Sequence, residues 1–151
     1  MNREPLLPEK AGNDFKGYKF TEYVFLIIAL ISTIRSLIHL FAPDGGARSI
    51  ATIDLNIEGG DIIISVFALW GSSQLLMAFV FLIVYFRYKN LIPLMYLIII
   101  IEYSLRIIIG FLKPIETTGI APGAIGNLII LPLALIMLYF SISSRDAPKE
   151  G

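Results

Sequence analysis

The stretch from Ile62 to Leu112 reads IIISVFALWGSSQLLMAFVFLIVYFRYKNLIPLMYLIIIIEYSLRIIIGFL. It holds two long apolar runs, 62–86 and 91–112, which are separated only by the polar turn Arg87-Tyr88-Lys89-Asn90. About 20 residues of α-helix are enough to cross a hydrocarbon core about 30 Å thick. The stretch therefore predicts two membrane-spanning helices, and so short a turn must hold them antiparallel.

Two further apolar runs flank this hairpin, at 20–42 and at 123–142, and each is again long enough to span a bilayer. The composition agrees, because 56% of the 151 residues are hydrophobic and 16% are charged. Typical soluble domains have about 45–50% apolar and about 25% charged residues. The sequence thus predicts an all-α integral membrane protein, a four-helix bundle in which residues 1–151 form a single membrane domain.

Basic residues are divided unevenly between the two predicted sides of the membrane. Eight of them lie in segments 1–19, 87–90 and 143–151, whereas only Arg48 and Lys113 lie in the other two connections. The positive-inside rule then predicts that both termini, as the tails 1–19 and 143–151, are cytoplasmic. The sequence contains no transit peptide and no Asn-x-Ser/Thr site, which favours a prokaryotic cytoplasmic membrane.

The first connection on the outer side has a pattern of its own. Residues Thr52 to Glu58 alternate between polar and apolar, which predicts a short strand or extended segment over the mouth of the bundle. A partly ordered linker is an equal alternative. Asp61, which follows two glycines, is expected to cap the second span.

Polar side chains within the spans are the main functional signal. Ser32, Arg35, Ser36 and His39 follow one another at i, i+3, i+4 and i+7, which places them on one helical face. The other three spans also carry polar or aromatic side chains at similar depth, in the outer half of the membrane. Such residues usually face a bundle interior or a wet cavity. We therefore predict an inward-facing ligand site formed by Arg35, His39, Trp70, Gln74, Glu102, Arg106 and Asn127.

The predicted cluster has more positive than negative charge. It contains two arginines and one glutamate, and a buried excess of positive charge requires an anion. The anion could be Asp54 or Asp61 of the first outer connection, or a ligand carboxylate or phosphate, which suits the planar fork of arginine. The alternative is a structural network, in which Glu102 and Arg106 form an ion pair within one helix and Arg35 extends to the membrane boundary.

Several classes of function are excluded or unsupported. The chain has no cysteine and one histidine, so disulfides and thiolate metal sites are excluded, and we expect no metal and no cofactor. No phosphate-binding loop and no basic run for nucleic acid is present. The sequence favours a non-catalytic, multi-pass protein that contacts the lipid bilayer and binds a small anionic or lipid-like ligand.

Two other functions stay open. One is an accessory subunit of a larger membrane complex, or a homo-oligomer, in which Gly119, Gly123 and Gly126 allow a partner helix to approach closely. The other is a small membrane enzyme acting on a lipid, with Glu102 as its acid or base.

A family resemblance rests on short motifs. Phe41-Ala42-Pro43 ends the first apolar run, residues Asn56 to Gly60 precede the second, and Arg106 lies within the third. This layout, from Tyr23 to Tyr139, resembles the small four-span membrane proteins grouped as DoxX-like, many of them uncharacterised. The chain lacks the cysteines that some redox-linked members carry. The resemblance implies a four-helix bundle, often within a larger membrane assembly, and it transfers no catalytic residue.

Overall fold

The computed structural model describes residues 4–143, which form four long α-helices. They are α1 (Lys19–Phe41), α2 (Gly60–Arg87), α3 (Ile92–Leu112) and α4 (Pro122–Ile142), and a 3-10 turn, η1 (Lys89–Leu91), joins α2 to α3. Each α-helix begins and ends within two residues of a predicted span, and each is long and apolar enough to cross a membrane. The predicted all-α, four-helix architecture is confirmed. Of the predicted tail 143–151, only residue 143 lies within the described residues.

The outer surface of the bundle is strongly apolar. Only 17% of the most apolar part of α2 and of α4 is buried, and the largest share, in α3, is 33%. Side chains such as Leu69, Phe111 and Leu128 are mostly exposed. An apolar surface of this extent is not stable in water. The four helices therefore indicate an integral, multi-pass membrane protein.

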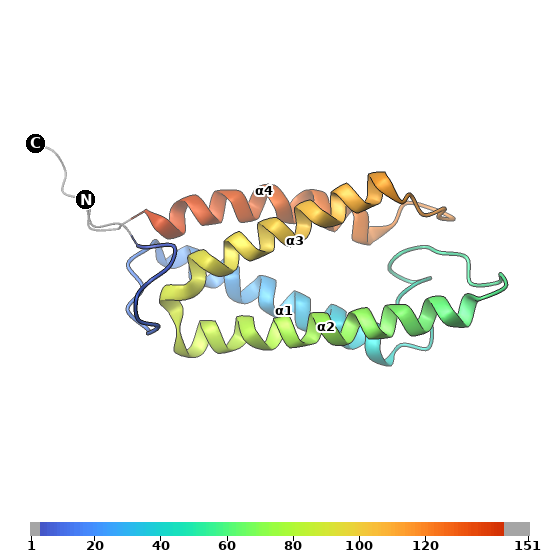
Figure 1. The fold of residues 1–151 in the computed structure, drawn as a ribbon, viewed down its shortest axis with the longest axis horizontal. Coiled ribbons are helices and arrows are strands. Elements are labelled where there is room, and N and C mark those ends of the chain that lie inside the picture. The colour runs from blue at the N-terminus through green and yellow to red at the C-terminus, as the bar shows by residue number, and fades with distance from the viewer. Residues whose placement is uncertain (1–3, 144–151) are drawn as a thin grey trace, which may run out of the picture.

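The helices pack as two pairs. α1 packs along α2 and α3 packs along α4, whereas contacts between the two pairs are few. Figure 1 shows that the pairs meet at the end that holds η1 and diverge toward the opposite end. We call these the terminal end and the loop end. Near the terminal end, the ring of Phe25 packs edge-to-face against Phe81 and Tyr96, at centroid distances of 5.5 and 5.7 Å, which joins the pairs in one core.

Residues 4–18 fold against the terminal end of the bundle. The side chain of Asn90, which is buried, accepts the N–H of Gly12 at 2.8 Å and donates to the carbonyl of Lys10 at 2.8 Å. The backbone N–H of Asn90 also donates to the carbonyl of Gly12, at 3.1 Å. These bonds connect the N-terminal segment to the turn between α2 and α3.

We expect Asn90→Ala to release this segment. The substitution removes two part-buried hydrogen bonds, each of which contributes about 0.5–1.5 kcal/mol, so trypsin should cleave after Lys10 and Lys16 several times faster. The measurement is the rate of limited proteolysis in mild detergent. The matched control is Asn13→Ala, because that side chain makes only longer, exposed bonds of 3.3 and 3.4 Å. Equal cleavage rates in the two variants would contradict the expected result.

Two sequence-based predictions concern the loop end; for the first, the strand is excluded among the described residues, whereas an extended segment and a linker both stay open. Between Thr52 and Glu58 no strand forms; instead the carbonyl of Thr52 accepts the backbone N–H and the hydroxyl of Thr118, at 2.8 and 3.0 Å. The cap prediction for Asp61 is wrong. α2 begins earlier, after Gly59 in a left-handed conformation with φ of 86°, which glycine adopts at little cost. Asp61 therefore lies in the first turn.

Candidate intramembrane binding site

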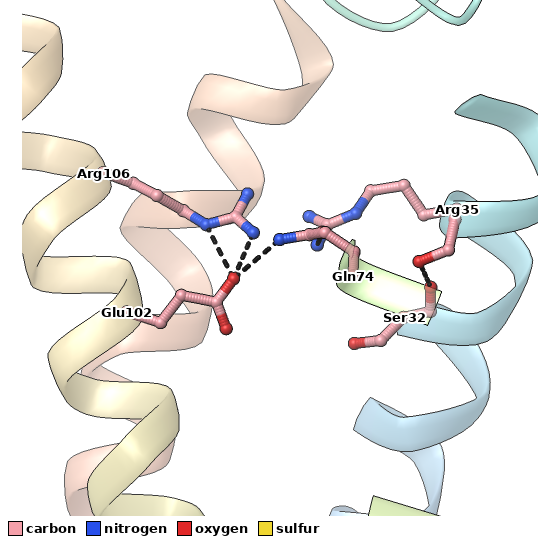
Figure 2. Close-up of polar contacts among 6 residues, drawn as sticks. Ser32, Arg35, Gln74, Glu102 and Arg106 are labelled. Atoms are coloured by element: carbon pink, nitrogen blue, oxygen red, sulfur yellow. Dashed lines mark hydrogen bonds and ion pairs between the residues drawn. The ribbon is translucent and has the colours of Figure 1, made fainter. Parts of the chain in front are cut away.

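Polar side chains from three helices form a continuous hydrogen-bonded row inside the bundle. Arg35 of α1 donates from Nη2 to Oε1 of Gln74 on α2 at 2.5 Å, and Gln74 Nε2 donates to Oε1 of Glu102 on α3 at 2.7 Å. Arg106, one turn along α3, donates to the same Glu102 oxygen from Nε at 3.2 Å and also from Nη2. Figure 2 shows the row running from α1 to α3. We call these four residues the arginine network.

Trp70 of α2 lies against both arginines. Its ring centroid is 4.8 Å from the guanidinium carbon of Arg106 and 5.9 Å from that of Arg35. The guanidinium of Arg106 also lies 5.0 Å from the ring of Tyr103. An aromatic face attracts a cation at such distances. The predicted site residue Trp70 therefore adds to the stabilisation of the two positive charges.

His39 is buried next to the network and makes no polar contact with it among the described residues. Its Nδ1 lies 2.7 Å from the carbonyl oxygen of Gly45, and its ring packs against Trp70 and Phe67 at centroid distances of 5.0 and 5.7 Å. Its Nε2 is enclosed and has no hydrogen-bond partner in the described part of the chain. His39 thus anchors the turn after α1, and its ring packs against Trp70, which in turn lies against both arginines.

The turn that receives His39 is held by Asp44. The carboxylate of Asp44 accepts the N–H of Gly46 at 3.0 Å and the N–H of Ser49 at 2.7 Å. Partial burial raises the pKa of Asp44, but these hydrogen bonds outweigh burial and hold the pKa below its usual value. An ionised Asp44 therefore stabilises the turn, in which Gly45 and Gly46 both have positive φ.

Three residues considered from the sequence do not join the network. Asn127 is half-buried on α4, and its side chain makes no hydrogen bond to another described residue. Asp54 accepts the N–H of Asn56 at 2.9 Å within its own loop, and Asp61 lies in the first turn of α2. No loop carboxylate among residues 4–143 pairs with either arginine. The ion pairs in that range are Lys16–Asp14, Lys89–Glu22 and Arg106–Glu102.

An apolar groove of about 420 Å³ lies beside the network, between α1 and α4. Its polar lining consists of Ser32, Arg35 and Tyr103. Gly123 and Gly126 of α4 also line it, and their missing side chains leave part of its space. The isoleucines on its walls come from α1, α4 and the first loop: Ile28, Ile31, Ile34, Ile38, Ile50, Ile129 and Ile130. This groove could not be predicted from the sequence, because isoleucines that face lipid and isoleucines that face a groove have the same spacing.

The unbalanced positive charge is located on Arg35. Glu102 neutralises Arg106 by direct pairing, whereas Arg35 bonds to the neutral amide of Gln74. The Nε of Arg35 is enclosed and has no acceptor among the described residues. Arg35 lines the groove on one side and a small void next to Gln74 and Glu102 on the other. The groove wall therefore carries a cation that lacks both a counter-charge and one hydrogen-bond partner.

Comparison with models of known protein families, with curated proteins and with solved structures finds no match. The resemblance to DoxX-like proteins stays a prediction. Among the described residues, no group of three or more histidine and acidic side chains is placed to hold a metal ion.

Proposed function

We propose that the protein is a non-catalytic membrane protein that binds an anionic, lipid-like ligand in the groove between α1 and α4. The observation that supports this proposal is the position of Arg35, on the wall of an apolar groove with only a neutral amide as its hydrogen-bond partner. A charge at this depth in a membrane costs several kcal/mol unless it is paired or hydrated. A ligand carboxylate or phosphate supplies the missing counter-charge.

The other residues of the predicted site have supporting roles in this proposal. Gln74 orients the guanidinium of Arg35, and Glu102 with Arg106 fixes the amide of Gln74. Trp70 lies against the two cations. Arg35 is therefore the residue that binds the anion, and the remainder of the arginine network positions it.

We also infer that the terminal end of the bundle is cytoplasmic, so that the groove opens in the outer half of the membrane. Residues 10–19 and the turn 87–90 carry five of the described basic side chains at this end, whereas the connections at the loop end carry only Arg48 and Lys113. The positive-inside rule supports this orientation. A prokaryotic cytoplasmic membrane remains our proposal for the location.

No separate observation favours the two alternative functions. Gly123 and Gly126 line the groove, where we propose that the ligand lies rather than a partner helix. Glu102 Oε1 accepts N–H groups from Gln74 and Arg106. In these bonds the carboxylate of Glu102 acts as an acceptor that positions its neighbours.

The proposal is tested by identifying the lipids that co-purify with the protein in mild detergent. Mass spectrometry should show an anionic amphiphile enriched over its share of the membrane extract. Arg35→Gln should lower this enrichment about tenfold or more, because a hydrogen-bonded charge pair is lost. The matched control is Arg48→Gln, which removes an exposed loop arginine. Equal enrichment in the two variants would contradict the proposal.

A further inference from the structure

The groove is closed at the loop end of the bundle. The carbonyl of Ile50, a groove residue, accepts the N–H of Gly123 at the start of α4, at 3.4 Å. Next to it, Thr52 bonds to Thr118 through the carbonyl, and its hydroxyl donates to the carbonyl of Gly119 at 3.1 Å. The two connections 42–59 and 113–121 are thus joined to each other where the groove would otherwise open to water.

The groove is open sideways, between α1 and α4. Its lining residues Ile31, Ile34 and Ile129 keep 54%, 59% and 58% of their surface exposed. All three lie within membrane-spanning helices, so the surroundings that they face are hydrocarbon. A ligand therefore reaches the groove from the bilayer, and it must itself be soluble in the bilayer.

The volume of the groove suits one acyl chain. A groove of about 420 Å³ holds about fourteen groups of the size of a water molecule, at about 30 Å³ each. This volume is in the range of pockets that enclose one small ligand. The second chain of a phospholipid would have to lie outside the groove, in the bilayer.

The charge of the groove suits a head group with one negative charge. Among the described residues, Arg35 is the only charged one that lines the groove; Ser32 and Tyr103 are neutral. The planar fork of arginine matches the two oxygens of a carboxylate. A zwitterionic head would bring a second cation close to Arg35 and Arg106, which would repel it.

Building on the proposed function, we propose that the ligand is a single-chain carboxylate amphiphile, a long-chain fatty acid, which reaches the groove sideways from the bilayer. Its carboxylate pairs with Arg35, and its chain lies along the isoleucines of α1 and α4. The pairing gives Arg35 the counter-charge that the arginine network lacks.

Trp70 offers a direct measurement, because it is the single tryptophan of the chain and lies beside Arg35. The protein is placed in vesicles of a zwitterionic phospholipid, and a fatty acid brominated near its carboxyl group is added. We expect saturable quenching of Trp70 fluorescence. Arg35→Gln should weaken the apparent affinity about tenfold or more.

Glycine substitutions provide a second test that leaves the arginine network intact. A Cβ at Gly126 or at Gly110 would meet no atom within 4 Å, but only Gly126 lines the groove. Gly126→Leu should therefore fill the groove and weaken the quenching by the brominated fatty acid. The matched control Gly110→Leu should leave it unchanged. Undiminished affinity in Gly126→Leu would overturn the inference.

A brominated two-chain anionic phospholipid separates this inference from the proposed function. If it quenches Trp70 as strongly as the fatty acid does, and Arg35→Gln weakens its binding, the single-chain carboxylate is overturned and the proposed function stands. If neither probe depends on Arg35, both the inference and the proposed function are overturned.

Discussion

Glu102→Gln is expected to destabilise the protein by about 3 kcal/mol or more, much more than Arg106→Gln. Removing one member of an ion pair within the membrane leaves its partner uncompensated in a medium of low polarity. Glu102→Gln leaves Arg35 and Arg106 with no negative charge near them. Arg106→Gln leaves Arg35 and Glu102, which remain connected through Gln74 and sum to zero charge. Two substitutions in one ion pair should therefore have unequal effects.

The measurement is the thermal unfolding of each variant in lipid nanodiscs. The double variant Glu102→Gln with Arg106→Gln should be more stable than Glu102→Gln alone, because it retains one uncompensated arginine where the single variant retains two. Such non-additivity is the sign of direct coupling between neighbouring side chains. Equal losses in the two single variants would show that the charge balance of the network does not control stability.

The helices of this fold could be predicted from the sequence because the bilayer imposes their length. A run of about 20 apolar residues has few other stable conformations, since every backbone N–H and carbonyl in hydrocarbon needs an internal partner. The arginine network could be predicted in part for the same reason. Arg35, Gln74, Glu102 and Arg106 are residues that hydrocarbon excludes, and their similar depth in different spans placed them together.

The groove and the pairing of the helices could not be predicted. The hydropathy of α4 is high along its whole length, so nothing in the pattern separates Ile129, which lines the groove, from Leu128, which is exposed outside it. Asn127 lies at a similar depth, so the sequence predicts it in the network as well, but depth does not specify the side of a helix. His39 has a local backbone partner, Gly45, which depends on the conformation of the turn after α1.

Gly71→Val is expected to separate α1 from α2 and to lower the stability of the bundle by about 3 kcal/mol, at the upper end of the usual cost of overpacking. A Cβ at Gly71 would lie 2.5 Å from the Cβ of His39 and 3.3 Å from the carbonyl oxygen of Ser36. Both of these atoms are fixed by the backbone of α1, so a side-chain rotation cannot relieve the contact. Small residues at such positions let membrane helices approach closely.

The displacement caused by Gly71→Val should also reach the arginine network. Arg35 and Gln74 lie one helical turn from the contact, on α1 and α2, and their 2.5 Å hydrogen bond joins these two helices. If α1 moves away from α2, this bond lengthens and Trp70, the neighbour of Gly71, changes its surroundings. The expected results are a lower Tm and a shift in tryptophan emission.

The matched control is Gly110→Val, because a Cβ there meets no atom within 4 Å. If both variants had the same Tm and emission, close approach of α1 and α2 at Gly71 would not be what holds this pair together.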